Sequence, residues 1–196
     1  MDIAHLKQVS QTALPIYSQT QVEAALDQMA QNISADFQDK NPLVLCVVIG
    51  GIVTFGQLIT RMQFPLQIDY VHASRYRGNT TGKEVVWKAK PNISLQDRHI
   101  ILVDDILDGG ITLKDIKSFC LQNHAKSVST AVLLDKVNCR LDDGLKHADY
   151  VGLSLTEDHY VFGYGLDYKT YLRNAPGIYA VEPSMLKKND DLVVTD

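Results

Sequence analysis

Hydrophobic residues follow two different patterns that alternate along this chain. Five of them recur at the three- and four-residue spacing of one helix face: Val22, Leu26, Met29, Ile33 and Phe37. This spacing predicts a helix over residues 21–38. A capping box formed by Thr20 and Glu23 would begin the helix, and Asn41-Pro42 follows its end.

Short apolar runs without alternation predict strands buried on both faces. Leu43–Ile49 and Ile100–Val103 are such runs. Further strands are expected at Ile68–His72, Val85–Lys88, Ser129–Leu134, Tyr150–Leu155 and Ile178–Val181, and further helices at Val53–Met62 and Ile111–Gln122. The segment Val85–Lys88 should pair as a hairpin partner. Strands that alternate with helices predict an α/β fold with a largely parallel sheet, which binds ligands at the carboxyl ends of its strands.

Length and composition narrow the class of protein. The 196 residues contain no linker-like stretch, so one domain over residues 1–196 is expected. A net charge of −4 speaks against a general nucleic-acid binder, and any anion site must be local. The longest apolar run has 11 residues, whereas a membrane-spanning helix needs about 20. The first residues lack a signal-peptide pattern, and three cysteines without zinc-site spacing suggest free thiols, so we expect a cytoplasmic protein without a membrane partner.

The most informative segment is residues 99–112, HIILVDDILDGGIT. A buried strand leads into the adjacent carboxylates Asp104 and Asp105, which could accept hydrogen bonds from a vicinal diol such as ribose. Asp108 follows, where a general base could act. Gly109-Gly110 then lead into a helix whose free N–H groups, with the Thr112 hydroxyl, suit a phosphate group.

This segment resembles the phosphoribosyl-diphosphate (PRPP) binding motif of type I phosphoribosyltransferases. A second string, Val161-Phe-Gly-Tyr-Gly-Leu-Asp-Tyr followed by Arg173, is similar to the C-terminal segment of the hypoxanthine-guanine phosphoribosyltransferase family. The likeness covers residues 43–181. It implies a type I phosphoribosyltransferase fold, in which a central, largely parallel sheet is flanked by helices and carries a small hood and a mobile lid loop.

The resemblance also implies roles for residues on the PRPP side. Asp104 and Asp105 would hold the ribose hydroxyls, and Asp108 would be the base near purine N7. The 5′-phosphate would be bound by the loop residues Asp108, Gly109, Gly110, Ile111 and Thr112. The pyrophosphate would be bound by Gly50, Gly51 and Arg173, and the lid would comprise residues 74–82, with Ser74, Arg75 and Tyr76 at its start.

On the purine side, the resemblance places the Lys136 ammonium at the C6 oxygen and the Tyr160 ring against the base. Backbone groups near Val161 would contact the opposite purine edge. Asp167 would help to hold Mg²⁺ near the purine site, with Asp104 and Asp105 as further candidate metal ligands. A lysine only donates hydrogen bonds, so it favours an oxo group at C6 over an amino group.

Four positions depart from the family pattern. Ile49 stands where a lysine is usual, which removes a side-chain contact to pyrophosphate, and Asp104 replaces a longer glutamate. Gly109 replaces a threonine and so removes one hydroxyl from the phosphate loop. The lid reads Ser74-Arg75-Tyr76 instead of Ser-Tyr, so either Arg75 replaces the tyrosine or one residue is inserted.

The expected activity is purine salvage, in which the phosphoribosyl group of Mg²⁺-bound PRPP is transferred to N9 of hypoxanthine or guanine. One alternative is a phosphoribosyltransferase that prefers xanthine. Another, from a different class, is a PRPP-fold regulator of a pyrimidine operon that binds RNA; such a protein should show a basic face, which the net charge of −4 disfavours. Family members are usually dimers or tetramers, so a homo-oligomer is expected.

Overall fold

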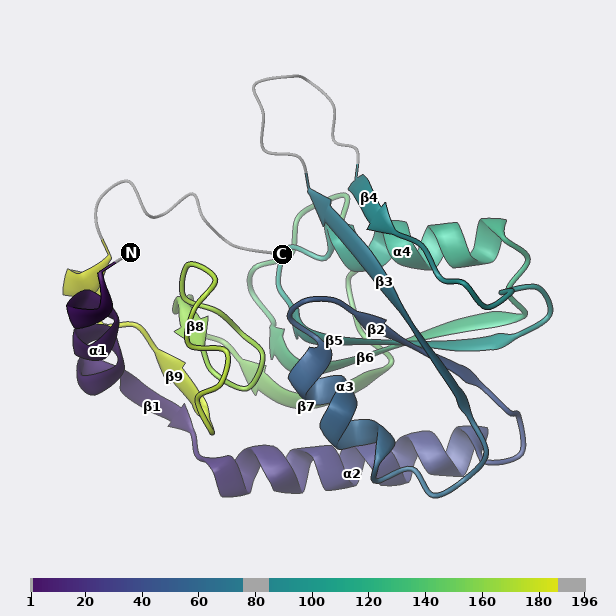
Figure 1. The fold of residues 1–196 in the computed structure, drawn as a ribbon, viewed down its shortest axis with the longest axis horizontal. Coiled ribbons are helices and arrows are strands. Elements are labelled where there is room, and N and C mark those ends of the chain that lie inside the picture. The colour runs from purple at the N-terminus through teal and green to yellow at the C-terminus, as the bar shows by residue number, and fades with distance from the viewer. Residues whose placement is uncertain (1, 76–84, 187–196) are drawn as a thin grey trace.

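The computed structural model of the protein describes residues 2–75 and 85–186, which form two β-sheets and the helices around them (Figure 1). The helices are α1 (Ile3–Thr12), α2 (Gln19–Phe37), α3 (Ile52–Ile59), α4 (Ile111–Gln122) and the 3₁₀ turn η1 (Pro183–Met185). The strands are β1 (Leu14–Tyr17), β2 (Leu43–Val47), β3 (Gln67–Arg75), β4 (Val85–Ala89), β5 (His99–Leu107), β6 (Ser127–Lys136), β7 (Tyr150–Leu155), β8 (Val161–Phe162) and β9 (Ile178–Ala180).

The larger sheet has six strands in the order β4-β3-β2-β5-β6-β7. Its neighbouring strands are parallel except for β4, which pairs antiparallel with β3 as the predicted hairpin partner. Helices α2 and α3 pack on one face of this sheet, and α4 packs on the other. The prediction of an α/β fold with a largely parallel sheet is therefore confirmed.

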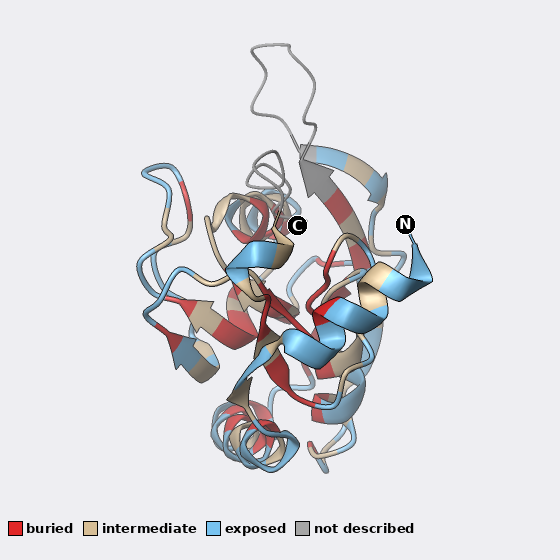
Figure 2. Ribbon diagram, turned by 90° about the vertical axis from the view of Figure 1, so that its left-hand side faces the viewer, coloured by how far each residue is buried: buried red, intermediate tan, exposed pale blue. Residues whose placement is uncertain are grey.

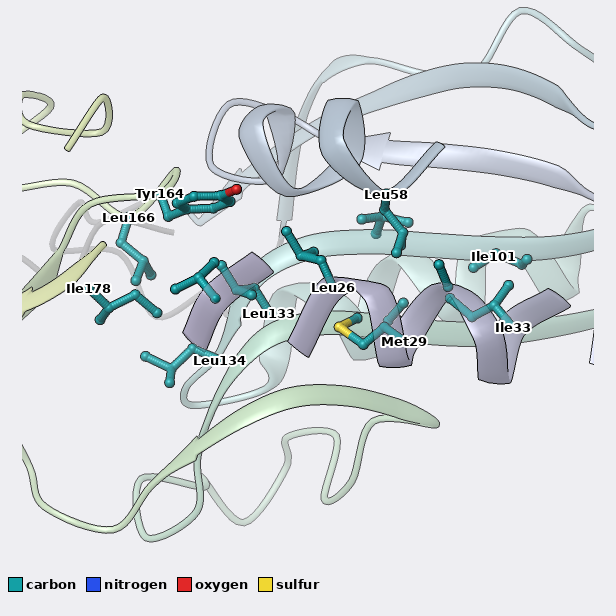
Figure 3. Packing of buried hydrophobic residues seen from close by; sticks show 14 of the residues in the cluster. Leu26, Met29, Ile33, Leu58, Ile101, Leu133, Leu134, Tyr164, Leu166 and Ile178 are labelled. Carbon is teal, nitrogen blue, oxygen red and sulfur yellow. The ribbon is translucent and has the colours of Figure 1, made fainter. Parts of the chain in front are cut away.

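Successive residues of the central strands enter two separate cores, because side chains alternate across a strand. In β5, Ile101 and Val103 belong to the core under α2 and α3, whereas Ile100 and Leu102 belong to the core under α4. Figure 3 shows part of the first core, where α2 lies against Ile101 and Leu133 of the sheet. In Figure 2 the buried residues gather along the sheet, between the helices. Two-sided burial explains why these strands lack alternation in the sequence.

Helix α2 begins two residues before the predicted start. Ser18, not Thr20, is its N-cap: the Ser18 hydroxyl accepts from Gln21 N at 3.3 Å, and the Gln21 side chain accepts from Ser18 N at 2.9 Å. The predicted capping box of Thr20 and Glu23 is therefore wrong. Ser18 and Gln21 form the capping box instead, because Ser18 has the extended backbone that an N-cap requires. The five apolar residues on which the helix was predicted are all buried.

Four strands beside the candidate site end at other residues than predicted. Strand β5 continues to Leu107 and β6 to Lys136, so Asp104, Asp105 and Lys136 are strand residues. Strand β2 ends earlier, at Val47. Ser74 and Arg75, predicted as the start of a loop, belong to β3 because their backbones pair with β4. Tyr76 and the remainder of the predicted lid lie outside the described residues.

A small second sheet, in the antiparallel order β1-β9-β8, accounts for the expected hood. The sequence predicted β9 but neither β1, β8 nor the N-terminal helix α1. Phe162 and Tyr168 are buried in one cluster with Val9 of α1 and Val181, and α1 lies beside this sheet (Figure 1). All three cysteines are free thiols, as expected. Among the described residues, no helix is both long and apolar enough to cross a membrane.

Candidate active site

The acidic end of β5 lies against the turn that follows β2. Asp105 is 7% exposed, and a Cβ atom added to Gly50 would come within 2.2 Å of its carboxylate oxygen. Only glycine therefore allows the turn to pass this close to the carboxylate. Burial raises the pKa of Asp105 above its usual value, although a hydrogen bond with Asp104 and the charge of Arg173 act in the opposite direction.

The glycine loop after β5 is shaped by its second glycine. Gly110 has a left-handed backbone (φ 81°), and a Cβ atom there would lie 2.5 Å from the carbonyl oxygen of Leu145. This residue is the N-cap of α4 and provides no capping side chain. The buried Thr112 lies in the first turn of the helix. The N-terminus of α4 therefore faces the site through backbone groups, which suits an anion.

Two cavities adjoin this end of β5. The first, here named the glycine-loop cavity, has about 490 Å³ of empty space, including the solvent at its open mouth. Its polar lining comes from the end of β5, the turn after β2, the start of α4 and the C-terminal segment: Asp104, Asp105, Asp108, Gly50, Gly110, Thr112 and Arg173. Predicted residues Gly51, Gly109 and Ile111 do not line it. A Cβ atom on Gly51 would lie 2.7 Å from the carbonyl oxygens of Val47 and Val103, so Gly51 serves close packing of the chain.

The second cavity, here named the lysine cavity, has about 410 Å³ of empty space, including the solvent at its open mouth. It is lined by predicted purine-site residues and three others: Lys136, Tyr160, Val161, Asp167, His159, Leu166 and Ile106. Asp105 and Asp108 line this cavity as well as the glycine-loop cavity. The two cavities therefore meet at the end of β5, and a ligand with an anionic part and a planar part could extend from one into the other.

Lys136 is 7% exposed and is held between two carboxylates. Its Nζ donates to Asp158 Oδ1 at 2.8 Å and lies 3.8 Å from Asp108 Oδ1. Burial by itself would lower the pKa of Lys136, but the hydrogen bond to Asp158 and the charge of Asp108 raise it above its usual value. The side chain is therefore a charged donor at neutral pH. The hydrogen bond from Lys136 in turn lowers the pKa of Asp158.

Tyr160 and Val161 place the small sheet beside the lysine cavity. Tyr160 packs edge-on against the buried Tyr168, with ring centroids 5.7 Å apart and an interplanar angle of 76°. Its carbonyl oxygen accepts from Val181 N at 2.8 Å, and Val161 begins β8. The aromatic ring is thus fixed by the hood, while Lys136 belongs to the large sheet.

Arg173 connects the two acidic elements of the site. Its guanidinium donates to Asp167 Oδ1 at 2.6 Å and to the carbonyl oxygen of Gly165 at 2.6 Å, and it lies 3.8 Å from Asp105. Asp167 also accepts from Thr170 N at 2.6 Å. Arg173, which is predicted to bind pyrophosphate, lines the glycine-loop cavity together with Gly50.

Arg140 is a site residue that the sequence reading missed. Its Nη1 donates to the carbonyl oxygens of Leu107 and Asp108, both at 2.6 Å, and to that of Lys136 at 3.0 Å. Its Nη2 pairs with Asp135. One guanidinium thus joins the end of β5 to the end of β6. The only signal in the sequence is its position four residues after Lys136, which does not by itself indicate such contacts.

The fold and the paired cavities define the class of protein: a type I phosphoribosyltransferase. A model of the phosphoribosyl transferase domain matches residues 14–170, and the chain belongs to this family. It is 34% identical over 176 residues to a hypoxanthine-guanine phosphoribosyltransferase of Staphylococcus epidermidis, covering 88% of this chain and 96% of that one. It is 27% identical over 174 residues to a hypoxanthine-guanine-xanthine phosphoribosyltransferase of Tritrichomonas foetus, covering 87% and 92%.

Solved structures agree with this assignment. A hypoxanthine phosphoribosyltransferase from Staphylococcus aureus superimposes with a TM-score of 0.82 at 28% identity, covering 88% of this chain and 93% of that chain. A hypoxanthine-guanine phosphoribosyltransferase from Bacillus anthracis gives a TM-score of 0.77 at 29% identity, covering 86% and 96%. The chain matches most of the length of these relatives, which are named as phosphoribosyltransferases, and this favours an enzyme over the RNA-binding alternative.

Proposed function

We propose that this protein transfers the 5-phosphoribosyl group from PRPP to N9 of hypoxanthine or guanine, which releases pyrophosphate and gives IMP or GMP. In this reaction the bond between ribose C1′ and the diphosphate oxygen breaks, and a bond between C1′ and N9 forms. The observation that supports it best is the meeting of the two cavities at Asp105 and Asp108. There the ribose would lie between its phosphate groups and the base.

The glycine-loop cavity is the proposed site for PRPP. The backbone N–H groups at the start of α4 and the Thr112 hydroxyl would bind the 5′-phosphate, as helix N-termini commonly do. Asp104 and Asp105 would accept hydrogen bonds from the ribose hydroxyls. Gly50 and Arg173, which line the same cavity, would contact the diphosphate. Ile49 provides no ammonium there, so the guanidinium of Arg173 is the proposed cationic contact.

The lysine cavity is the proposed site for the base. Lys136 would donate to an oxygen at purine C6, and an amino group at that position would meet it donor to donor. Tyr160 provides an aromatic ring for stacking on a planar base. Asp108 lines both cavities and would accept the N7 proton as N9 forms its bond to ribose. Because the ribosyl group becomes cationic as the diphosphate leaves, the surrounding carboxylates would stabilise the transition state.

We propose Mg²⁺ as the cofactor. This ion prefers oxygen ligands and is commonly held by one or two carboxylates together with substrate phosphates. Asp104 and Asp105 line the glycine-loop cavity, where the diphosphate would lie, and Asp167 lines the adjoining lysine cavity. Within residues 2–75 and 85–186, no three His, Cys, Asp or Glu side chains form a group that could hold a metal unaided. The substrate would therefore complete the coordination, and the bound ion would neutralise charge on the diphosphate.

A substrate panel tests the function directly. The purified protein is incubated with PRPP, Mg²⁺ and each of hypoxanthine, guanine, xanthine and adenine, and the nucleotide products are measured. We expect turnover of hypoxanthine and guanine that stops in excess EDTA and returns when Mg²⁺ is added. Faster turnover of xanthine than of either base would favour the xanthine-preferring alternative. Absence of any nucleotide product would refute the proposal, and undiminished turnover in EDTA would refute its metal requirement.

A further inference from the structure

The segment between β7 and β8 is tied to the end of β6 at the mouth of the lysine cavity. After β7 ends at Leu155, residues 156–160 lead to Val161, the first residue of β8. Lys136 Nζ donates to Asp158 Oδ1 at 2.8 Å, and Asn138 Nδ2 donates to the carbonyl oxygen of Thr156 at 2.9 Å. The same short segment supplies Tyr160, so these two contacts join the ammonium side of the cavity to its aromatic side.

Lys136 and Asp158 differ sharply in exposure. The side chain of Lys136 is 9% exposed, whereas that of Asp158 is 81% exposed. Asp158 is also absent from the residues that line the lysine cavity. Its carboxylate therefore approaches the ammonium from the solvent side. An ammonium has three N–H donors, so a donor used by Asp158 leaves others for Asp108 and for a ligand in the cavity.

We propose that Asp158 is a positioning residue for base recognition: it fixes the Lys136 ammonium in the orientation that contacts the purine C6 oxygen, and it fixes residues 156–160 beside the base. This inference rests on the proposed function. Lysine carries its charge on a flexible four-carbon stem, so holding it in one rotamer costs side-chain entropy. The hydrogen bond to Asp158, which lies outside the cavity, already orients the ammonium in the free protein. The side-chain entropy is therefore lost before the base binds.

Four groups face the ammonium or its partner and bear on its titration: Asp108, Cys139, Asp158 and His159. Burial raises the pKa of the Cys139 thiol, so this neighbour stays neutral at ordinary pH. Loss of the Asp158 charge would leave Asp108 as the carboxylate beside Lys136. The pKa of Lys136 should then fall, because burial disfavours the charged ammonium and only one of the two carboxylates that stabilise it remains.

The experiment compares Asp158→Asn with Asp158→Glu and two controls. Glu157→Gln removes a neighbouring charge from a fully exposed side chain. Asn138→Ala removes the hydrogen bond to the carbonyl oxygen of Thr156 and leaves the contact between Lys136 and Asp158 in place. KM and kcat are measured for hypoxanthine and adenine with PRPP and Mg²⁺. For Asp158→Asn we expect KM for hypoxanthine to rise about tenfold, the order expected for a charge-assisted hydrogen bond, with little change in kcat. The preference for hypoxanthine over adenine should fall, because adenine offers the ammonium no acceptor at C6.

The other variants separate positioning from a general structural role. Asp158→Glu should restore most of the preference, since it keeps the charge. Glu157→Gln should behave as the wild type, and Asn138→Ala should weaken both bases equally, which leaves their ratio unchanged. The alkaline limb of kcat/KM for hypoxanthine should move to lower pH in Asp158→Asn alone. Ionisation of the base itself is common to all variants and cannot cause that difference.

Two results would overturn the inference. One is an Asp158→Asn variant with wild-type KM, base preference and pH profile. The other is tighter hypoxanthine binding in that variant, which would make Asp158 a competitor of the base for Lys136. If the wild type itself forms no nucleotide from oxopurines and PRPP, the proposed function fails instead, so the two failures are distinguished by the wild-type measurement.

Discussion

The two cavities are built in different ways. The glycine-loop cavity takes most of its polar lining from one short stretch, Asp104–Thr112, in which glycine backbones and a helix N-terminus do much of the work. Apart from the residues that it shares with the β5 region, the lysine cavity is lined by Lys136 at the end of β6 and by residues 159–161, 166 and 167, which lie further along the chain. A backbone site depends on local conformation, whereas a side-chain site depends on long-range placement.

This difference explains which substitutions each cavity should tolerate. Only a proline removes a backbone donor, so most substitutions at the glycines of the loop act through sterics and strain. Side chains on the lysine side can be exchanged without moving the chain, so their effects should appear in the choice of base. Asp108 lines both cavities, so a substitution there concerns the glycine-loop side and the lysine side at once.

The largest expected effect is therefore at Asp108. In Asp108→Asn we expect kcat to fall by about 10²–10⁴-fold, the usual range for loss of a general base, because the amide cannot take the N7 proton. PRPP affinity should change far less, since the loop backbone remains. Steady-state kinetics and PRPP titration measure both values, with the exposed Asp39→Asn as a control. If PRPP binding is lost while turnover of bound substrate persists, Asp108 is a ligand of PRPP instead of a base.

A smaller effect, confined to recognition of the base, is expected when Lys136 is replaced. Lys136→Ala should weaken transition-state binding of hypoxanthine and guanine by about 1.5–3 kcal/mol, the range for a hydrogen bond to a charged group. The rate with adenine should hardly rise, because no new acceptor appears. The measurement is kcat/KM for all three bases with wild type and variant. A wild type that uses adenine as well as hypoxanthine would contradict this role of Lys136.

The smallest effects separate two glycines that lie close in sequence. Gly50→Ala would place a methyl group against the buried Asp105 carboxylate, and overpacking of this kind costs about 1–3 kcal/mol of stability. Gly56→Ala meets nothing within 4 Å inside α3 and should stabilise the protein by about 0.5–1 kcal/mol through its helix propensity. Thermal unfolding measures both. PRPP affinity should fall only in Gly50→Ala, and equal behaviour of the two variants would disprove the close approach of Gly50.

Sequence patterns predicted the large sheet well, because strands buried on both faces leave uninterrupted apolar runs such as Leu43–Val47. They also predicted that a ligand site would lie at the carboxyl ends of these strands. They missed β1 and β8, which are four and two residues long and pair with β9 from distant parts of the chain. Strands this short carry little periodicity.

Within the candidate site, contiguous motifs were predictable and contacts between distant residues were not. Asp104–Thr112 follow one another in the sequence, so their order alone indicated a phosphate loop. Arg140 and Asp158 act by reaching carbonyl or ammonium groups on other segments, at Leu107 and Lys136. Such contacts depend on how the chain folds back on itself, which no local spacing records.

Strand β5 has a consequence for how the molecule opens. Ile100, Ile101, Leu102 and Val103 are completely buried, and β5 pairs with β2 on one side and β6 on the other. Amide hydrogens in such a strand exchange with solvent only when most of the structure unfolds. The three short strands of the hood can instead open locally. Exchange should thus be slowest in the strand that carries Asp104 and Asp105 and faster beside Tyr160, so the lysine cavity can open locally while the carboxylates of β5 stay fixed.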